Sequence, residues 1–200
     1  YWNGPSFTNY EEFIDYTSPN EIFVDVYPYR KDTDTSVQIN NMVKNIFVQL
    51  KETSIEKNIP WWYIGQVFSA GEFREPTPAE INLEVYLALI YGAKGIFYFD
   101  YATNNKNHIS LLNRGRGYFV DNFAIDTLAK ATFLEEYKVQ PKYDAVQQLN
   151  NKLKILGPIL LNLKSTGTGN SQEGTLSSLV QDVSGNFEIG TFENKEKEKE

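Results

Sequence analysis

The sequence predicts an α/β fold in which parallel strands alternate with helices. The main observation comes from residues 60–100, where an apolar run, a polar loop, a capped helix, a glycine-containing turn and a second apolar run follow in order. This succession of strand, loop, helix and strand is the βαβ unit of a parallel sheet. A second observation is that residues 21–27 form another apolar run, followed by a stretch with helical spacing. Loops at the carboxyl ends of such strands carry functional sites, so these segments also indicate where to look for chemistry.

The first third of the chain predicts a short helix, a strand and a longer helix. Residues 10–16 (YEEFIDY) read as a helix that ends before a turn. Residues 21–27 (EIFVDVY) are rich in β-branched and aromatic residues, which favours a strand. Pro28 ends that strand because proline lacks the N–H that a ladder needs. Residues 37–57 predict a helix, because their apolar positions recur at helical spacing.

The middle of the chain predicts a strand, a helix and a further strand. Residues 61–68 are almost continuously apolar, which is typical of a parallel strand buried on both faces. A helix begins after Thr77, because this threonine, the following proline and Glu80 form the pattern of a capping box. Gly92 is expected to end this helix in a left-handed conformation. The last strand covers residues 95–101.

The last third predicts a long helix and a small amount of β structure. Residues 102–118 read as a polar loop, and residues 121–140 as an irregular, partly helical segment. A long helix is expected over residues 143–163, with a break at the Gly-Pro pair at 157–158. The Gly/Ser/Thr-rich residues 165–174 read as a linker or turn. Two alternating segments, residues 176–180 and 187–192, predict a β-hairpin ahead of a disordered Lys/Glu tail.

Composition excludes several classes of function. The chain has 200 residues, 41% of them hydrophobic, and a formal net charge of −7. An acidic chain does not fit a phosphate backbone, so we expect no nucleic-acid partner. The absence of cysteine removes disulfides and thiolate chemistry, and a single histidine argues against a zinc site. No apolar run reaches the roughly 20 residues needed to span a bilayer. No glycine-rich nucleotide motif follows a strand, so neither a metal nor a cofactor is expected.

The spacing of the strands suggests part of a larger sheet. Their starts are separated by roughly 35 residues, which is the repeat of a (β/α)8 barrel of roughly 250 residues. Three units are too few to close a barrel. We therefore interpret residues 1–164 as the C-terminal part of a barrel, with strands six to eight and a closing helix. Residues 165–200 would be a linker and the start of a β-rich domain or a disordered tail. A small open α/β sheet, complete in itself, is the alternative.

Four segments occur in the order DVYPY, PWWYIGQVF, REPTPAE and YGAKGIFYF. In this order they resemble the last three units of bacterial glycoside-hydrolase-like barrels, related to the clan-A enzymes and to the β-galactosidase-like family 42. The resemblance covers about residues 10–166. It implies a carbohydrate-active domain that acts on an oligo- or polysaccharide. It also implies a secreted, periplasmic or cell-surface protein, with a cytoplasmic location as the alternative.

The resemblance also assigns roles to positions at the strand ends. Clan-A enzymes carry their nucleophilic glutamate at the end of strand seven, and this chain has Gln66 there. An amide cannot attack an anomeric carbon as a carboxylate does. The acid/base residue would follow strand four, which has no counterpart in these 200 residues. A carbohydrate-binding barrel without catalysis, or an interaction domain of a surface protein, is therefore the alternative function.

Three carboxylates are candidate catalytic residues. Asp25 interrupts an otherwise apolar strand, where a carboxylate is costly unless it is paired or exposed at the sheet edge. Glu72 and Glu75 lie in the loop after the second strand, where a solvated loop acid is the alternative for each.

Six further residues are candidates for substrate binding. They are polar or aromatic and lie at or just after the carboxyl ends of the strands: Tyr27, Tyr29, Gln66, Arg74, Tyr98 and Asp100. Tyrosine rings suit stacking on sugars, although core packing is the alternative for each of them. Gln66 can donate and accept hydrogen bonds to a sugar, or bridge strands instead. Arg74 binds substrate or pairs with a loop glutamate. The only histidine, His108, is expected at the surface.

Overall fold

The computed structural model of this chain describes residues 10–103, 108–114, 137–139, 141–171 and 187–194. A three-stranded parallel sheet lies at its centre, in the order β1 (Ile22–Asp25), β2 (Trp61–Gln66) and β4 (Gly95–Phe99). The predicted α/β class and the three parallel strands are therefore confirmed. Within the described residues the sheet is open at both edges, and no barrel is formed.

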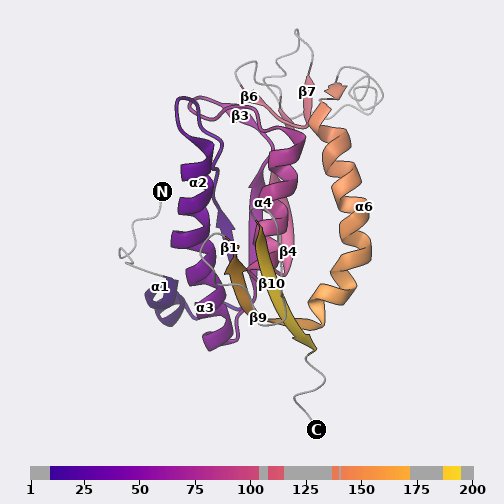
Figure 1. Ribbon diagram of the computed structural model, residues 1–200. Helices are drawn as coiled ribbons and strands as arrows, with labels where there is room; N and C mark the ends of the chain where they lie inside the picture. The colour runs from indigo at the N-terminus through magenta and orange to yellow at the C-terminus, as the bar shows by residue number, and fades with distance from the viewer. Residues whose placement is uncertain (1–9, 104–107, 115–136, 140, 172–186, 195–200) are drawn as a thin grey trace, which may run out of the picture.

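The helices that connect these strands lie on one side of the sheet (Figure 1). The first connection is a continuous helix made of α2 (Thr35–Met42), a π-helical turn η1 (Val43–Phe47) and α3 (Val48–Lys57). It begins two residues before the expected position, because the carboxylate of Asp34 accepts hydrogen bonds from the backbone N–H and the hydroxyl of Ser36. The short helix α1 (Tyr10–Thr17) packs against α3.

The second connection confirms the capping signals in the sequence. In α4 (Pro78–Ile90) the Thr77 hydroxyl accepts from the backbone N–H of Glu80, and the Glu80 carboxylate accepts from the N–H of Thr77. This reciprocal pair satisfies two backbone donors that a helix start leaves unpaired. After the helix, Gly92 has the predicted left-handed conformation, with φ of 95°.

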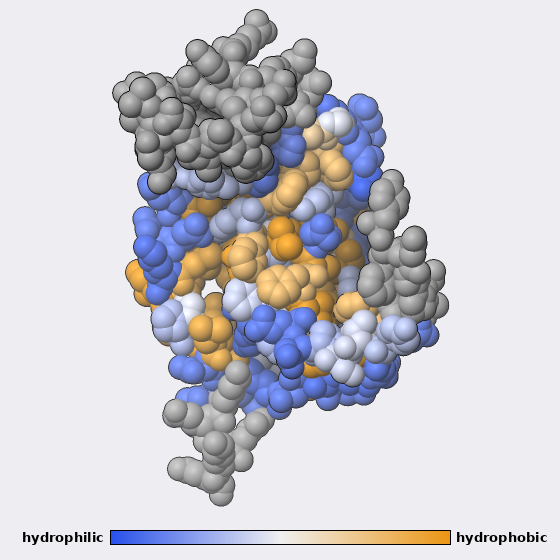
Figure 2. Space-filling view, turned by 180° about the vertical axis from the view of Figure 1, so that it is seen from behind, coloured by the Kyte–Doolittle hydropathy of each residue, from blue (hydrophilic) through white to orange (hydrophobic). Residues whose placement is uncertain are grey.

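The two faces of the sheet differ in burial. The face under the helices carries fully buried side chains such as Trp61 and Tyr63, which pack around Phe47. The opposite face carries Phe23 and Phe97, each about half exposed, and the rings of these two residues and of Trp62 lie 5.6–5.7 Å from one another. In Figure 2, which views the molecule from behind, apolar side chains gather over the middle of the surface. Burial of β2 on both faces, as its apolar sequence predicted, is therefore not seen within the described residues.

The C-terminal part differs from the sequence prediction in two ways. Helix α6 (Pro141–Leu161) continues through the Gly-Pro pair at 157–158. Strand β9 (Leu163–Asn170) occupies most of the expected linker, and it pairs antiparallel with β10 (Glu188–Asn194). The glycine- and threonine-rich sequence of β9 has few apolar side chains, so its strand character comes from this pairing, which the composition does not reveal. Residues 176–180, the expected partner of the second hairpin strand, lie outside the described residues.

The hairpin of β9 and β10 packs against the helical layer. The hydroxyl of Tyr91, just after α4, donates to the carboxylate of Glu188 at 3.3 Å. The ammonium of Lys51 on α3 donates to the hydroxyl of Thr168 at 3.1 Å. The chain therefore passes into a packed strand at Leu163, two residues before the expected domain boundary.

Short strands form above the carboxyl ends of the sheet, where the sequence predicted only loops (Figure 1). One pair consists of β3 (Ser69–Ala70) and β6 (His108–Ile109), and a second sheet contains β5 (Ala102–Thr103), β7 (Leu112–Arg114) and β8 (Tyr137–Val139). Most of the expected irregular segment, residues 121–140, lies outside the described residues. None of the helices in the described ranges has the length and apolar character needed to cross a membrane.

Candidate functional site

An aromatic cluster lies where the carboxyl ends of the three strands meet the short strands above them. Its centre is Phe68, which is buried just after β2. The ring of Phe68 lies 5.0 Å from that of Tyr27 and 5.3 Å from that of Phe99, in both cases edge to face. Phe73 completes the cluster, 5.7 Å from Tyr27. Phe99 remains 43% exposed, so the cluster offers one open ring to a ligand.

Asp25 and Tyr27 lie on one side of this cluster, as the sequence analysis expected. The Tyr27 hydroxyl donates a long hydrogen bond of 3.5 Å to the Asp25 carboxylate, and Asp25 is exposed. Burial, followed by the negative charge of Asp25, raises the pKa of Tyr27 to about 12. The phenol therefore keeps its proton at neutral pH and acts as a hydrogen-bond donor.

Asp100 lies on the other side, paired with a residue that the sequence analysis placed at the surface. His108 Nε2 is 3.0 Å from Asp100 Oδ1, and both side chains are only about one-fifth exposed. The His108 ring also lies 5.2 Å from Phe68. The pairing of β6 with β3 carries His108 to this position. A loop of seven residues without a recognisable pattern separates the two partners, so the sequence offers no signal for this pair.

Gln66 has a structural role in this geometry. Its side chain is fully buried, and its oxygen accepts from the backbone N–H of Tyr29 at 3.0 Å. Its amide nitrogen lies within 3.2 Å of the carbonyl oxygens of Tyr29, Phe68 and Arg74. All polar atoms of the side chain are thereby used to bridge the strand ends, which is the alternative that the sequence analysis considered for this residue.

Tyr29 and Arg74 support the loop and do not face the cluster. The buried Tyr29 hydroxyl donates to the backbone carbonyl of Glu80 at 2.6 Å. Arg74 forms a bidentate ion pair with the Glu80 carboxylate, with N–O distances of 2.6 and 2.9 Å. Its guanidinium also lies over the Tyr29 ring. The arginine thus pairs with the helix-capping glutamate and not with a loop glutamate as expected.

The two loop glutamates also have cationic partners. Glu72 pairs with Arg30 at 3.1 Å in an exposed position. Glu75 pairs at 2.8 Å with Lys142, an almost fully buried lysine that also donates to the carbonyl of Ile109. Burial lowers the pKa of Lys142, and the charge of Glu75 opposes this shift. Neither glutamate is brought into the aromatic cluster.

Tyr98 lies on the opposite face of the sheet from Phe99. Its hydroxyl donates to the side-chain oxygen of Asn150 on α6 at 2.8 Å. Burial raises its pKa above the ordinary value. Of the nine candidate residues, the structure therefore gathers Asp25, Tyr27 and Asp100 at one edge, and places Tyr98 in the helical layer.

A buried carboxyl group that the sequence analysis missed lies beneath the site. Glu84 of α4 is fully buried, and one of its oxygens accepts from the Tyr63 hydroxyl at 3.1 Å. The other oxygen has no hydrogen-bond partner and would lie 2.9 Å from a Cβ at Gly65. Burial raises the pKa of Glu84 well above its usual range, although the hydrogen bond from Tyr63 opposes this. The carboxyl group is therefore protonated in the folded chain well above the pH at which an exposed glutamate ionises.

We expect Glu84 to make the folded chain less stable as pH rises. The folded state holds a proton that the unfolded state releases near pH 4.5, so the free energy of unfolding falls as pH increases above that value. Glu84→Gln removes this titration and should flatten the decrease. Urea unfolding of both proteins from pH 4 to pH 8 measures it, with exposed Glu21→Gln as the control. Parallel pH profiles for the wild type and Glu84→Gln would contradict the expectation.

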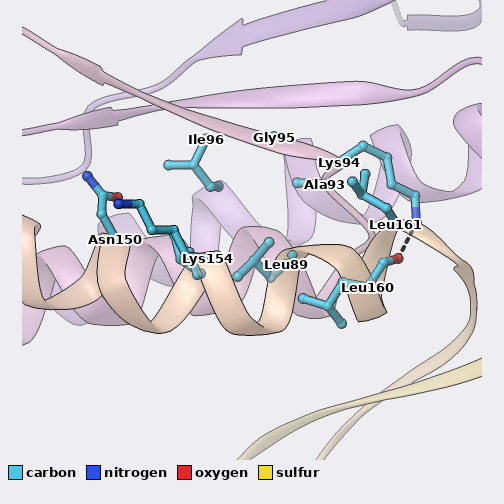
Figure 3. Close-up of a pocket in the computed structure, with 11 residues that line it drawn as sticks. Leu89, Ala93, Lys94, Gly95, Ile96, Asn150, Lys154, Leu160 and Leu161 are labelled. Atoms are coloured by element: carbon cyan, nitrogen blue, oxygen red, sulfur yellow. Dashed lines mark hydrogen bonds between the residues drawn. The ribbon is translucent and has the colours of Figure 1, made fainter.

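A separate hollow of about 400 Å³ lies between α6 and the amino end of β4. Figure 3 shows Leu89 and Ile96 in its wall, and Lys94 at one end donating to the carbonyl of Leu160. Lys94 also donates to the carbonyl of Leu163 at 2.7 Å, and so holds the end of α6. This hollow is mainly apolar and is far along the strands from the carboxylates, so it is not part of the candidate site.

Comparison of the chain with known protein families, with curated proteins and with solved structures found no match.

Proposed function

We propose that the carboxyl edge of the sheet binds a carbohydrate, and that the chain is a carbohydrate-active domain of the glycoside-hydrolase type. The observation that carries the proposal is the exposed ring of Phe99, which lies 5.9 Å from the ring of Tyr27, at an edge that also carries the carboxylates of Asp25 and Asp100 at the ends of the two outer strands. An aromatic ring packs against the apolar C–H face of a sugar. Carboxylates accept hydrogen bonds from the hydroxyls at its rim, and the Tyr27 phenol donates one.

The sheet itself is open on one face within the described residues. We take the three strands as the last three of a (β/α)8 barrel whose other strands would cover the open face. Support comes from the rings of Phe23, Trp62 and Phe97, since parallel sheets almost always have both faces covered and a barrel interior is packed.

Among the candidate catalytic carboxylates, the geometry favours Asp25. It is exposed beside the aromatic cluster and has no cationic partner among the described residues, whereas Glu72 and Glu75 are each held in an ion pair with a cation. A binding role without catalysis is the second candidate. The observation that favours it is Gln66, whose amide occupies the expected nucleophile position and has every polar atom engaged by the backbone.

Binding to a panel of neutral gluco-, manno-, galacto- and xylo-oligosaccharides tests the proposal. We expect the wild type to bind at least one series, and Phe99→Ala and Asp25→Asn each to weaken that binding about tenfold, through loss of ring stacking or of one charged acceptor. Phe187→Ala removes a similarly exposed ring near the hairpin and should have no effect. Thermal melting checks that each variant is folded. The proposal is overturned if no series binds, or if Phe99→Ala and Phe187→Ala behave alike.

A further inference from the structure

A polar groove of about 380 Å³ lies between the carboxyl end of β1 and the helix formed by α2 and η1. Its size is within the range of small-molecule sites, roughly 300–1,000 Å³. Side chains from the strand, the helix and the following loop contribute to its wall, among them Asp25, Tyr27, Gln38, Asn41, Asn45 and Phe73. The sequence analysis did not consider the three amides.

The amides form a line along one side of the helix. Gln38, Asn41 and Asn45 follow at spacings of three and four residues, so they share a helical face. Asn45 lies within the π-helical turn η1, a feature that is frequent at functional sites. Within the described residues, none of the three side chains has a hydrogen-bond partner, and each therefore keeps its donors and its acceptor available to a ligand.

The groove is continuous with the aromatic cluster. Tyr27 and Phe73 line the groove and also belong to the cluster, with their ring centres 5.7 Å apart. Asp25 likewise contributes to both places. A ligand that stacks on Phe99 thus has a path past Tyr27 into the groove.

The charges of the groove indicate what kind of ligand fits it. Its charged wall residues are Asp25 and Arg30, and Arg30 is already paired with Glu72 at 3.1 Å and placed over the Phe73 ring. These wall residues therefore include no unpaired cation that could bind an acidic group of a ligand. Amides, a carboxylate and a phenol suit the hydroxyls of an uncharged sugar unit.

We propose that this groove is a second saccharide subsite, which takes a neutral sugar unit of a chain whose neighbouring unit lies on the aromatic cluster. This inference rests on the proposed function. It implies that the chain recognises an oligosaccharide of at least two units, with Asn41 and Asn45 as binding residues for the second one.

Calorimetric titration with gluco-, manno-, galacto- and xylo-oligosaccharides of one to four units tests the inference. We expect the affinity of the wild type to rise from one unit to two or three. The double substitution Asn41→Ala with Asn45→Ala should reduce the affinity for the longer sugars about tenfold, which corresponds to the loss of two ordinary hydrogen bonds, and leave the single unit unchanged. Asn40→Ala, on the same helix but outside the groove, is the matched control. An acidic series, uronic acid oligomers, should bind more weakly than the neutral one.

The outcomes separate this inference from the proposed function. If the wild type binds a sugar and Phe99→Ala weakens that binding, but length has no effect or the double variant behaves like Asn40→Ala, the second subsite is overturned and the first stands. Tighter binding of the acidic series overturns the neutral-sugar assignment. If no series binds the wild type, both proposals fall.

Discussion

Replacing Gln66 by glutamate is expected to destabilise the fold by about 3–5 kcal/mol, the usual cost of an uncompensated buried charge. The amide nitrogen of Gln66 lies near three backbone carbonyls. A carboxylate oxygen in its place would face those carbonyls with no donor between them. In the proposed barrel a nucleophilic glutamate would stand at this position, yet the backbone carbonyls around the side chain require the N–H groups of an amide. Gln66→Glu should therefore weaken the fold without creating a nucleophile.

Urea unfolding measures this effect, and pH gives a second readout. At pH 4 the introduced carboxyl group is more fully protonated than at pH 7, so the loss of stability should shrink as pH falls. Gln49→Glu, at an exposed position of α3, is the matched control and should change stability by less than about 0.5 kcal/mol. A Gln66→Glu variant that is as stable as the wild type and hydrolyses aryl glycosides would contradict the structural role of the amide.

Trp61→Ala is expected to cost about 3–5 kcal/mol, as removal of a large buried aromatic side chain does. Trp61 is fully buried on the helical side of the sheet, with its ring centre 5.3 Å from that of Phe47. The cavity left behind would lie in the middle of the core. Such a loss approaches the total stability of many domains, so the variant is expected to be partly unfolded at 25 °C.

Trp62→Ala provides the control within the same strand. Trp62 lies on the open face, where its ring stacks on Phe23 and lies tilted against Phe97, both about half exposed. Its removal should cost clearly less than that of Trp61, on the order of 1 kcal/mol for partly buried ring contacts. Chemical denaturation of the two variants measures the two losses in the free energy of unfolding. Equal losses would mean that the open face is covered in solution, by a second copy of the chain or by further strands.

The local part of the fold could be predicted because its signals are local. The capping box of Thr77 and Glu80 and the left-handed Gly92 depend on atoms within a few residues, and all appear as expected. Strand β9 could not be predicted, since its glycine- and threonine-rich sequence becomes a strand only through pairing with β10, 18 or more residues away. Helix α2 begins two residues before the apolar pattern starts, because the Asp34 side chain caps it and a cap contributes nothing to the apolar spacing.

The location of the candidate site could be predicted from the sequence, but only some of the residues that form it could be. Asp25, Tyr27 and Asp100 lie at or just after the carboxyl ends of parallel strands. The carboxyl ends of parallel strands lie at the same edge of a sheet, so the position of the site follows from the strand assignment. The pairing of β6 with β3 places His108 in the site. Arg74 lies outside it, because its guanidinium forms a bidentate ion pair with Glu80. These contacts are made between segments that meet only in the folded chain, so they cannot be predicted from residue spacing in the sequence.

The α/β class, the three parallel strands and the edge at which polar and aromatic residues collect follow from the amino-acid pattern, because periodicity and helix caps are properties of neighbouring residues. Packing between distant segments sets which face of β2 is covered, lets the amide of Gln66 bridge backbone groups, and buries Glu84 beneath the site. The physical reason is that burial and hydrogen-bond satisfaction depend on what packs against a side chain. Those partners come from distant parts of the chain.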